Sequence, residues 1–424
     1  MRIETLAAFR TRAQQQRSAV LDPRVVERSR RVIAAVRRRG DDAVLAEVRR
    51  FDFAGARPRD LWAGRRELRA AARTCPPELR RAITRCFDAI LAAHRKQKPR
   101  PIAHARRPFR IDLVPEPLAR VGGCVPRGTV GYPSTALMIG APAAVAGVGE
   151  LVLASPMPRD GSLDPVLSYA ALAAGATGIY RAGGAAAVAA LAYGTGTLPR
   201  VDTIVGPGNA FTTAAKWLVS ADVGIDTLAG PSELVVIASA DADVAAIVLD
   251  LEAQAEHGGG SVPTLRSLRS RGGPFAALIS DDALLLRTVA RSIDALGAPR
   301  GAIGLYRAPS LAAAIDAAAD AAPEHLSLAG RGAERLASRA RRAGAVFVGS
   351  RTAVAFGDYV AGSSHVLPTG GTARWASALR VEDLVRWTTR VRATGPLRGA
   401  AAAGAAVARY EGMKYHAASM ELRA

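Results

Sequence analysis

The stretch "ELVLASPMPRDGSLDPVLSYAALAAGATGIYRAGG" (150–184) decides the fold class. It opens with a short apolar run, "ELVLAS" (150–155), which predicts a strand. It continues with "DPVLSYAALAAG" (164–175), which predicts a helix, and ends with "GIYRAGG" (178–184), which predicts a strand and a glycine turn. Two strands joined through a helix lie parallel and cross over with a right hand. The stretch therefore predicts an α/β protein with a parallel sheet covered by helices.

The same alternation continues toward the C-terminus. We expect further strands at "VDTIVGPGN" (201–209), "ELVVIAS" (233–239) and "GAVFVGS" (344–350). We expect helices at "AAAVAALAYGT" (185–195), "AFTTAAKWLVS" (210–220) and "DVAAIVLDLEAQAEH" (243–257), the last of them ended by the three glycines at 258–260. On the N-terminal side, apolar residues at three- and four-residue spacing predict helices from Asp22 to about Arg100.

Three further segments have a different composition. The segment "SVPTLRSLRSRGGPF" (261–275) is rich in arginine and poorly periodic, so we expect an exposed loop or insertion there. The segment "FGDYVAGSSHVLPTGG" (356–371) predicts a glycine-rich loop. From "LRVEDLVRWTTRV" (379–391) to the C-terminus, the sequence predicts a helical tail.

Composition narrows the class of protein. The chain has 424 residues, of which 49% are hydrophobic and 22% charged, which fits a globular protein of two or three domains with a sizeable core. No apolar run is long enough to suggest a membrane span, and the N-terminus does not resemble a secretory signal. Three scattered cysteines are too few for a disulfide framework. We therefore expect a cytoplasmic protein.

The formal net charge of +20 raises the question of a polyanionic partner. Nearly all of the positive charge is arginine, and it is spread along the chain rather than gathered in a tail or a nucleic-acid-binding motif. This pattern favours a composition bias over a nucleic-acid partner, although a small acidic ligand would also feel the field.

Gln254 and His257 are candidate metal ligands. They lie three residues apart at the end of an expected helix, so they share one face. Oxygen and imidazole nitrogen together suit zinc or a similar ion, whereas the alternative is an ordinary solvated helix end. Asp358 lies in the expected glycine-rich segment, where small neighbours allow a ligand to approach closely.

His416 and Glu411 form a second polar group near the C-terminus. Five residues along an unbroken helix would place them about 140° apart. Either the helix breaks near Gly412, or the two side chains approach a site from different sides.

Two short motifs remain. "VGPGN" ends an expected strand and opens a helix, so Asn209 can cap that helix and Gly208 can let a nucleotide or phosphate approach. "AAPEHLSL" (321–328) places Glu324 beside His325. The simple interpretation of this pair is a solvated group at a helix start after Pro323; the alternative is a catalytic acid–base pair.

Several longer motifs occur in one order over nearly the whole chain: "YPSTALM", "GTLPRVDTIVGPGN", "IDTLAGPSE", "LEAQAEH", "APEHL", "GDYVAGSSHVLPTGGTAR" and "EGMKYHA", with "RRRGDDAV" and "HRKQKP" in the N-terminal part. Together they resemble the histidinol dehydrogenase family. The resemblance implies a homodimer with one zinc ion per subunit that uses NAD. Such enzymes oxidise the small molecule L-histidinol through the aldehyde to L-histidine, in the last steps of histidine biosynthesis.

The resemblance also implies a role for each matching residue. Glu324 and His325 match the catalytic pair, with His325 as the base for the alcohol proton and Glu324 activating water. Asn209 matches a residue that contacts NAD. The zinc ligands are implied to be Gln254, His257, Asp358 and His416, with His416 supplied by the partner subunit through a swapped tail. The implied substrate-binding residues are Ser232, Gln254, His257, His325, Asp358, His365, Glu411 and His416.

Some positions depart from the family pattern. Cys124 stands where a tyrosine is usual and Ala186 where a glutamine is usual, and both positions contact NAD in the family. Ser364 replaces the usual asparagine before His365. Each loss on the cofactor side would cost about 1 kcal/mol of NAD binding. The arginine-rich residues 264–273 also lack the strand-like residue pattern that is usual in the family at this place.

The resemblance implies two Rossmann-like parallel-sheet domains, N-terminal helices and a tail swapped in the dimer. We expect residues 22–124 and 232–380 to form the main domain with the catalytic and zinc residues, and residues 125–231 to form the nucleotide side. Residues 1–21 would be a helical segment packing with the tail, and residues 381–424 the tail itself. Two other functions stay open: a related zinc- and NAD-dependent dehydrogenase acting on another polar alcohol, and a non-catalytic binding protein.

Overall fold

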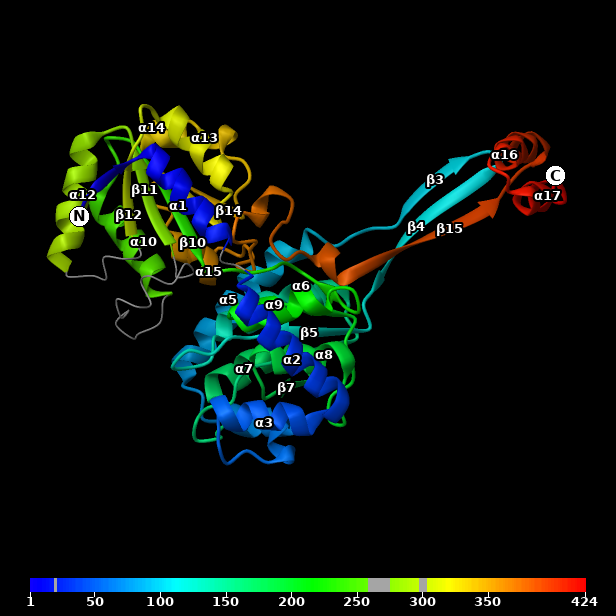
Figure 1. Cartoon of the computed structure of the whole chain (residues 1–424), viewed down its shortest axis with the longest axis horizontal. Helices are drawn as coiled ribbons and strands as arrows, with labels where there is room; N and C mark the ends of the chain where they lie inside the picture. Colours follow the sequence, from blue (N-terminus) through cyan, green and yellow to red (C-terminus); the bar gives the residue numbers. More distant parts are fainter. Residues whose placement is uncertain (19–20, 258–274, 297–302) are drawn as a thin grey trace.

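The computed structural model describes residues 1–18, 21–257, 275–296 and 303–424. It forms two units, each a mainly parallel sheet with helices on both faces, and a long arm that projects away from them (Figure 1). The fold class expected from the alternating strands and helices is confirmed. The expected helix end at 258–260 and the arginine-rich residues 264–273 lie outside the described residues. No described helix has the length and apolar composition to cross a membrane.

The first sheet has the strand order β1-β12-β11-β10-β13-β14, and all its neighbouring strands are parallel. Its strands are β1 (Ile3–Thr5), β10 (Glu233–Ala238), β11 (Phe275–Ser280), β12 (Ile303–Arg307), β13 (His325–Ala329) and β14 (Ala345–Val348). Its helices are α1 (Leu6–Ser18), α10 (Val244–Glu256), α12 (Ala283–Leu296), α13 (Leu311–Ala321), α14 (Arg331–Glu334) and α15 (Val354–Tyr359). Helices α1 and α13 bury one face of the sheet, and α10 and α12 bury the other.

The second sheet has the order β2-β7-β6-β5-β8-β9, with only the edge pair β2–β7 antiparallel. Its strands are β2 (Trp62–Gly64), β5 (Arg120–Cys124), β6 (Glu150–Ala154), β7 (Gly178–Tyr180), β8 (Thr203–Val205) and β9 (Gly224–Ile225). Its helices are α2 (Pro23–Arg39), α3 (Asp41–Phe51), α4 (Arg65–Ala72), α5 (Pro77–Arg95), α6 (Pro133–Ala146), α7 (Pro165–Ala173), α8 (Gly184–Tyr193) and α9 (Ala210–Val219). Helices α2, α3, α8 and α9 cover one face and α4 to α7 the other.

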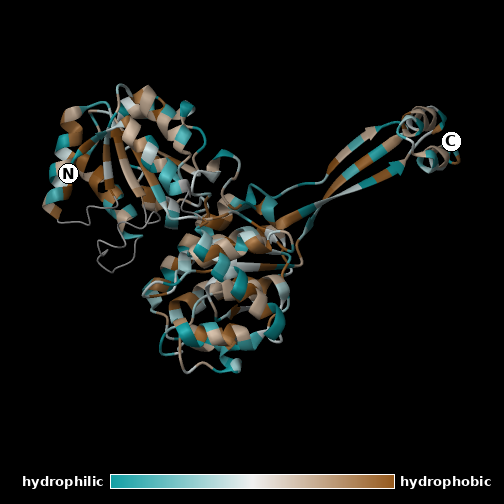
Figure 2. Cartoon of the chain, viewed as in Figure 1, coloured by the Kyte–Doolittle hydropathy of each residue, from teal (hydrophilic) through white to brown (hydrophobic). Residues whose placement is uncertain are grey.

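Local sequence signals explain where these helices begin. Side chains of Asp22, Asp164, Asn209 and Asp243 accept backbone N–H groups at the starts of α2, α7, α9 and α10. Proline occupies the first position of α2, α5, α6 and α7, where its missing N–H costs nothing. The central strands of both sheets, such as β5, β6, β10, β11 and β13, are buried, which explains their continuous apolar runs, and Figure 2 shows these runs inside a more polar exterior.

The N-terminal elements group differently from the expected division. Helices α2 to α5 and strand β2 belong to the second sheet, because the apolar faces of these helices pack there, with Val36 and Val44 beside α8. Within one chain, the first eighteen residues do not pack with the tail. Strand β1 instead extends the first sheet through β12, and Phe9 of α1 is buried between Phe275 and Tyr306.

The arm corrects the expectation for the C-terminal tail. Residues 385–393, expected to be helical, form strand β15 (Val385–Ala393), which pairs antiparallel with β4 (Phe109–Pro117), and β4 pairs with β3 (Ile102–Arg106). Valine, threonine and tryptophan are frequent in "VRWTTRVRA", and this composition favours a strand once a partner strand is present. Only the last part of the tail is helical, as α16 (Arg398–Tyr410) and α17 (Lys414–Glu421), at the far end of the arm (Figure 1). Short 3₁₀ turns lie at Pro58–Leu61, Ala337–Arg339, Thr372–Arg374 and Val381–Leu384.

Candidate functional site

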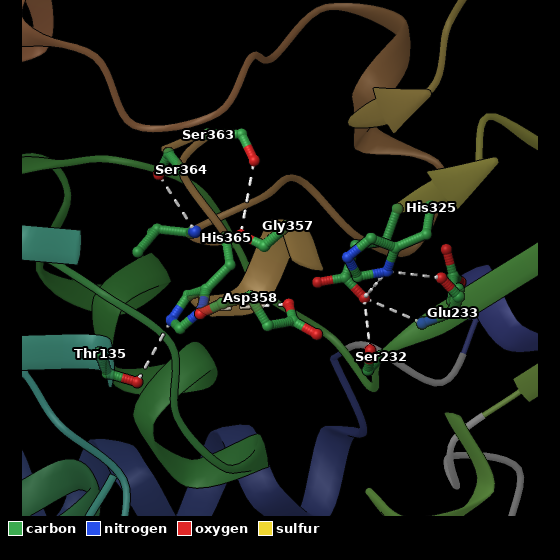
Figure 3. Close-up of polar contacts among 11 residues, drawn as sticks. Thr135, Ser232, Glu233, His325, Gly357, Asp358, Ser363, Ser364 and His365 are labelled. Atoms are coloured by element: carbon green, nitrogen blue, oxygen red, sulfur yellow. Dashed lines mark hydrogen bonds and ion pairs between the residues drawn. The ribbon is translucent and has the colours of Figure 1, made fainter. Parts of the chain in front are cut away.

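The candidate site lies at the amino ends of strands in the first sheet. Ser232 directly precedes β10 and Glu324 directly precedes β13, and the two strands pair with Leu234 opposite His325. This register places Ser232 and Glu324 side by side. The Ser232 hydroxyl donates a hydrogen bond of 2.6 Å to Oε2 of Glu324, and the Glu233 backbone N–H donates a second of 2.9 Å to the same oxygen (Figure 3).

Glu324 is a buried carboxyl group in this arrangement. Its residue is 7% exposed, and burial raises the pKa of the Glu324 carboxyl to about 7, although the Ser232 and Glu233 hydrogen bonds oppose the rise. A carboxyl group with this pKa can both accept and release a proton near neutral pH.

His325 is held in one tautomer. Its Nδ1 lies 3.1 Å from the Glu233 carbonyl oxygen, which can only accept a hydrogen bond, so Nδ1 carries the proton and Nε2 has the free lone pair. Burial lowers the pKa of His325, so the ring is neutral at neutral pH. The solvated helix start considered for this pair is wrong, because α13 ends before it and Glu324 and His325 are buried at the start of a strand.

Helix α10 brings two more candidates to the same edge of the sheet. It follows the carboxyl end of β10 and runs back along the sheet, so Gln254 and His257 lie at its amino edge. Gln254 is 3% exposed, and its Nε2 has no hydrogen-bond partner among the described residues. His257 directly follows the helix, with Nδ1 at 3.2 Å from the Ala253 carbonyl oxygen. Gln254 could offer its amide oxygen to a metal ion here, and His257 could offer Nε2, because its Nδ1 faces a carbonyl oxygen.

Asp358 lies on the short helix α15, where a loop was expected. The helix ends at Tyr359, and the glycine-containing loop begins after it. Burial raises the pKa of Asp358, and its electrostatic interactions with His325 and His257 oppose the rise. His257 and Asp358 also act electrostatically on both Glu324 and His325. Glu324, His325, His257 and Asp358 therefore lie in one small region. Among the described residues of one chain, no three His, Cys, Asp or Glu side chains form a ready-made metal site.

His365 is fixed between the two sheet units. Its Nδ1 lies 3.1 Å from the Asp358 carbonyl oxygen, and its Nε2 lies 3.4 Å from the Thr135 hydroxyl of α6 (Figure 3). Burial lowers the pKa of His365 to about 4. Thr135 was not recognised as a site residue from the sequence, where it was only one letter of "YPSTALM". The preceding Ser364 accepts the Val366 N–H at 3.2 Å, a turn contact within the loop.

His416 and Glu411 are not brought to this region within one chain. Helix α16 ends at Tyr410, Gly412 adopts φ +76°, and α17 begins at Lys414, so the helix breaks at Gly412 as one of the two expected alternatives required. Both side chains are exposed at the far end of the arm, away from the amino edge of the first sheet (Figure 1).

A separate crevice lies on the second sheet. The chain order passes from β5 to β6 and β7 on one side and then returns to β8 on the other, so the carboxyl ends of β5 and β8 form a topological switch point, where α/β sheets usually bind ligands. A small cavity of about 90 Å³ lies there, lined by Cys124, Gly183, Gly208 and Asn209 among others. Helix α8 starts at the cavity without a side-chain cap, and α9 starts with Asn209, whose Oδ1 accepts from the N–H groups of Phe211 and Thr212 as expected.

Cys124 and Ala186, the two positions where this chain differs from the family on the NAD side, add no charged or amide group to this crevice. Cys124 is buried, and burial raises the pKa of its thiol to about 11, so the thiol stays neutral. Ala186 is 3% exposed and packs in the core on the α8 side of the sheet. Its neighbour Ala187 lines the cavity instead.

Comparison with known proteins agrees with the motif order. The pattern of the histidinol dehydrogenase family matches residues 15–424. A histidinol dehydrogenase of Moorella thermoacetica is 41% identical over 415 residues, covering 94% of each chain. One from Synechococcus sp. is 40% identical over 420 residues, covering 95% of this chain and 93% of the relative. The crystal structure of histidinol dehydrogenase from Elizabethkingia anophelis superposes with a TM-score of 0.85 at 27% identity, over 96% of this chain and 95% of that one.

Proposed function

The chain belongs to the histidinol dehydrogenase family, and we propose that it oxidises L-histidinol to L-histidine through the aldehyde, using NAD and zinc. The buried pair of Glu324 and His325 is the observation that carries this proposal. Two successive oxidations need a proton acceptor for an alcohol and one for a water, and the pair supplies two acceptors with different properties.

His325 is the base for the alcohol. Its Nδ1–H is bound to the Glu233 carbonyl oxygen, so Nε2 is the atom that takes the hydroxyl proton as hydride leaves the carbon. Because burial lowers its pKa, the ring is ready to accept a proton at neutral pH. The fixed tautomer also keeps the ring from presenting the wrong nitrogen to the substrate.

Glu324 is the base for water in the second oxidation. Both hydrogen bonds from Ser232 and Glu233 reach Oε2, so water meets the carboxyl group at Oε1. With a pKa of about 7, Glu324 can take the proton of a water that attacks the aldehyde and then pass it to solvent. Ser232 therefore positions Glu324 in addition to its implied contact with substrate.

The residues at the amino ends of the strands in the first sheet could bind a zinc ion. Gln254 is a buried amide that would bind the ion through its oxygen, and Asp358 is a partly buried carboxyl group whose charged form a cation would stabilise. Gln254, His257 and Asp358 would hold the ion, with His416 from a second subunit as a fourth ligand. When bound, zinc would hold and orient the amino alcohol as a Lewis acid.

The backbone around the crevice on the second sheet suits a dinucleotide. Two of the side chains there differ from those usual in the family. Two helix N-termini, of α8 and α9, start at the cavity and suit an anionic pyrophosphate. Asn209 remains to contact NAD, which would accept the hydride in each oxidation. Cys124 and Ala186 supply neither the ring nor the amide usual at their positions, so NAD binding should be weaker than in the family.

The arm supports a dimer that shares its sites. Tyr410 is 94% exposed, and Tyr415, Leu422 and Val391 are also exposed on the arm. Apolar side chains gathered on a projecting segment favour burial against a partner. A second subunit would cover them and bring His416 and Glu411 to the amino edge of the other chain's first sheet.

The activity is tested first with purified, zinc-loaded protein, L-histidinol and NAD, by following NADH formation. We expect turnover that requires zinc and is lost in His325→Ala, with a raised Michaelis constant for NAD. Absence of turnover at full zinc content would contradict the proposed substrate. Turnover of another polar alcohol in a substrate panel would then support the related dehydrogenase.

Site sharing is tested by mixing two inactive variants, His325→Ala and His416→Ala, under conditions that exchange subunits. If His416 acts in the partner's site, each mixed dimer contains one intact site, and the mixture should recover about a quarter of the wild-type activity. If His416 acts within its own chain, every site keeps a defect and the mixture stays inactive. Each variant incubated alone is the control.

A further inference from the structure

We infer that Thr135 is a positioning residue for substrate binding, which acts by holding the ring of His365. The inference rests on the proposed function and concerns a residue that the sequence motifs leave without a role. Thr135 belongs to α6 of the second-sheet unit, whereas His365 follows α15 of the first-sheet unit. Their contact is therefore a polar tie between the two units next to the candidate site (Figure 3).

The surroundings of Thr135 make its hydroxyl unusual. The residue is 4% exposed, and the residues that follow it in the helix, from Ala136 to Ala143, are all buried and apolar. A hydroxyl in such a place needs a hydrogen-bond partner. Its partner here is Nε2 of His365, at 3.4 Å.

The direction of this hydrogen bond follows from the other side of the ring. Nδ1 of His365 lies 3.1 Å from the Asp358 carbonyl oxygen, which only accepts, so Nδ1 carries the proton. Nε2 of the neutral ring is then an acceptor, and the Thr135 hydroxyl must donate to it. Both ring nitrogens are engaged, so the ring is fixed in orientation and in tautomer.

His325 and His365, which interact electrostatically, then have different roles. His325 presents a free Nε2 to the substrate, while His365 has none to offer as a base and instead forms a fixed wall of the site. Removing the Thr135 hydroxyl would free the ring to rotate. Helix α6 would then no longer fix the position of His365, which forms part of a site whose other residues belong to the first-sheet unit.

Kinetics of two variants of Thr135 test the inference. Thr135→Val keeps the shape of the side chain and removes the hydroxyl, and we expect the Michaelis constant for L-histidinol to rise about tenfold, with a smaller change in kcat. Thr135→Ser keeps the hydroxyl and should remain within about twofold of wild type. Binding of L-histidinol to zinc-loaded protein, measured by calorimetry, should follow the same order. Wild-type values for Thr135→Val would overturn the inference.

A double-mutant cycle separates positioning from a general packing effect. If Thr135 acts through His365, adding Thr135→Val to His365→Ala should cause no further loss, whereas independent effects would add. Additive losses would contradict the inference.

A spectroscopic measurement stands apart from the proposed activity. With nitrogen-15 in the six histidines, the signal that disappears in His365→Ala should show the Nδ1–H tautomer in wild type and Thr135→Ser, and a mixture in Thr135→Val. A wild-type signal of the Nε2–H form would overturn the inference even if the protein proved active. Failure of L-histidinol turnover in wild type would count against the proposed function alone, since the tautomer is observed without substrate.

Discussion

Ser232 and Glu324 are 92 residues apart in the chain and share a hydrogen bond of 2.6 Å at the amino edge of one parallel sheet. The contact exists because β10 and β13 are direct neighbours in the sheet and begin at the same level. Parallel α/β sheets usually place ligands at the carboxyl ends of their strands. The proposed NAD site at the β5–β8 switch point would follow that rule, whereas the proposed substrate site lies at the amino ends of the strands in the first sheet.

The buried carboxyl group of Glu324 should make stability depend on pH. Its pKa is raised from 4.5 to about 7 by burial, so the folded protein binds a proton that the unfolded chain releases between these values. The resulting stability is present below about pH 4.5 and is lost as the pH rises through about 7. In metal-free protein, the free energy of unfolding of wild type relative to Glu324→Gln should fall by on the order of 3 kcal/mol over this range. Denaturant titrations at several pH values measure it, and parallel curves for the two proteins would contradict the assignment.

Zinc should stabilise the folded protein through Gln254 and Asp358. We expect zinc to raise the melting temperature of wild type, because it binds the folded site in preference to the unfolded chain. Asp358→Ala should abolish most of this shift and weaken zinc binding by at least tenfold. The matched control is Asp316→Asn, which removes an exposed carboxylate of α13 paired with Arg339 at 3.0 Å. An equal zinc response in both variants would exclude Asp358 as a ligand.

Two substitutions of Asn209 separate its capping role from its proposed role in NAD binding. Asn209→Asp keeps an acceptor for the N–H groups of Phe211 and Thr212, so stability should be nearly unchanged, while a negative charge should weaken NAD binding about tenfold. Asn209→Ala should lose NAD affinity and also about 1 kcal/mol of stability. Fluorescence titration with NAD and thermal unfolding give the two quantities. Unchanged NAD affinity in both variants would remove Asn209 from the cofactor site.

Removing one partner of the buried ion pair of Lys216 and Asp226 should be strongly destabilising. Lys216 is 1% exposed, and its ammonium group contacts Asp226 and donates to the Gly206 carbonyl oxygen at 3.1 Å, while Asp226 also accepts the Gly206 N–H at 2.6 Å. Lys216→Met would leave Asp226 buried and unpaired, so the free energy of unfolding should fall by about 3–5 kcal/mol. Arg339→Met, which breaks the exposed pair with Asp316, should change it by less than about 1 kcal/mol. Similar losses in the two variants would contradict this account.

Many of the individual strands and helices could be predicted from the sequence. Strands at 150–155 and 233–239 and the helix opened by Asn209 followed from local pattern, because apolar runs, caps and glycine turns act within a few residues. Strand β15 was missed, because "VRWTTRVRA" is a strand only when β4 lies beside it. The grouping of α2 to α5 with the second sheet also required knowledge of which apolar faces meet.

For the candidate site, the sequence by itself determined the residue types: a glutamate beside a histidine, a glutamine three residues before another histidine, and an aspartate among small residues. Their motif order was enough to indicate the family. Only the tertiary structure decided that Glu324 and His325 are buried, that Ser232 and the Glu233 backbone hold them, and that Thr135 holds His365. It also placed His416 at the end of an arm, away from the other proposed ligands. The physical reason is that strand register and burial, which fix hydrogen-bond partners and shift pKa values, arise from contacts between residues far apart in the chain.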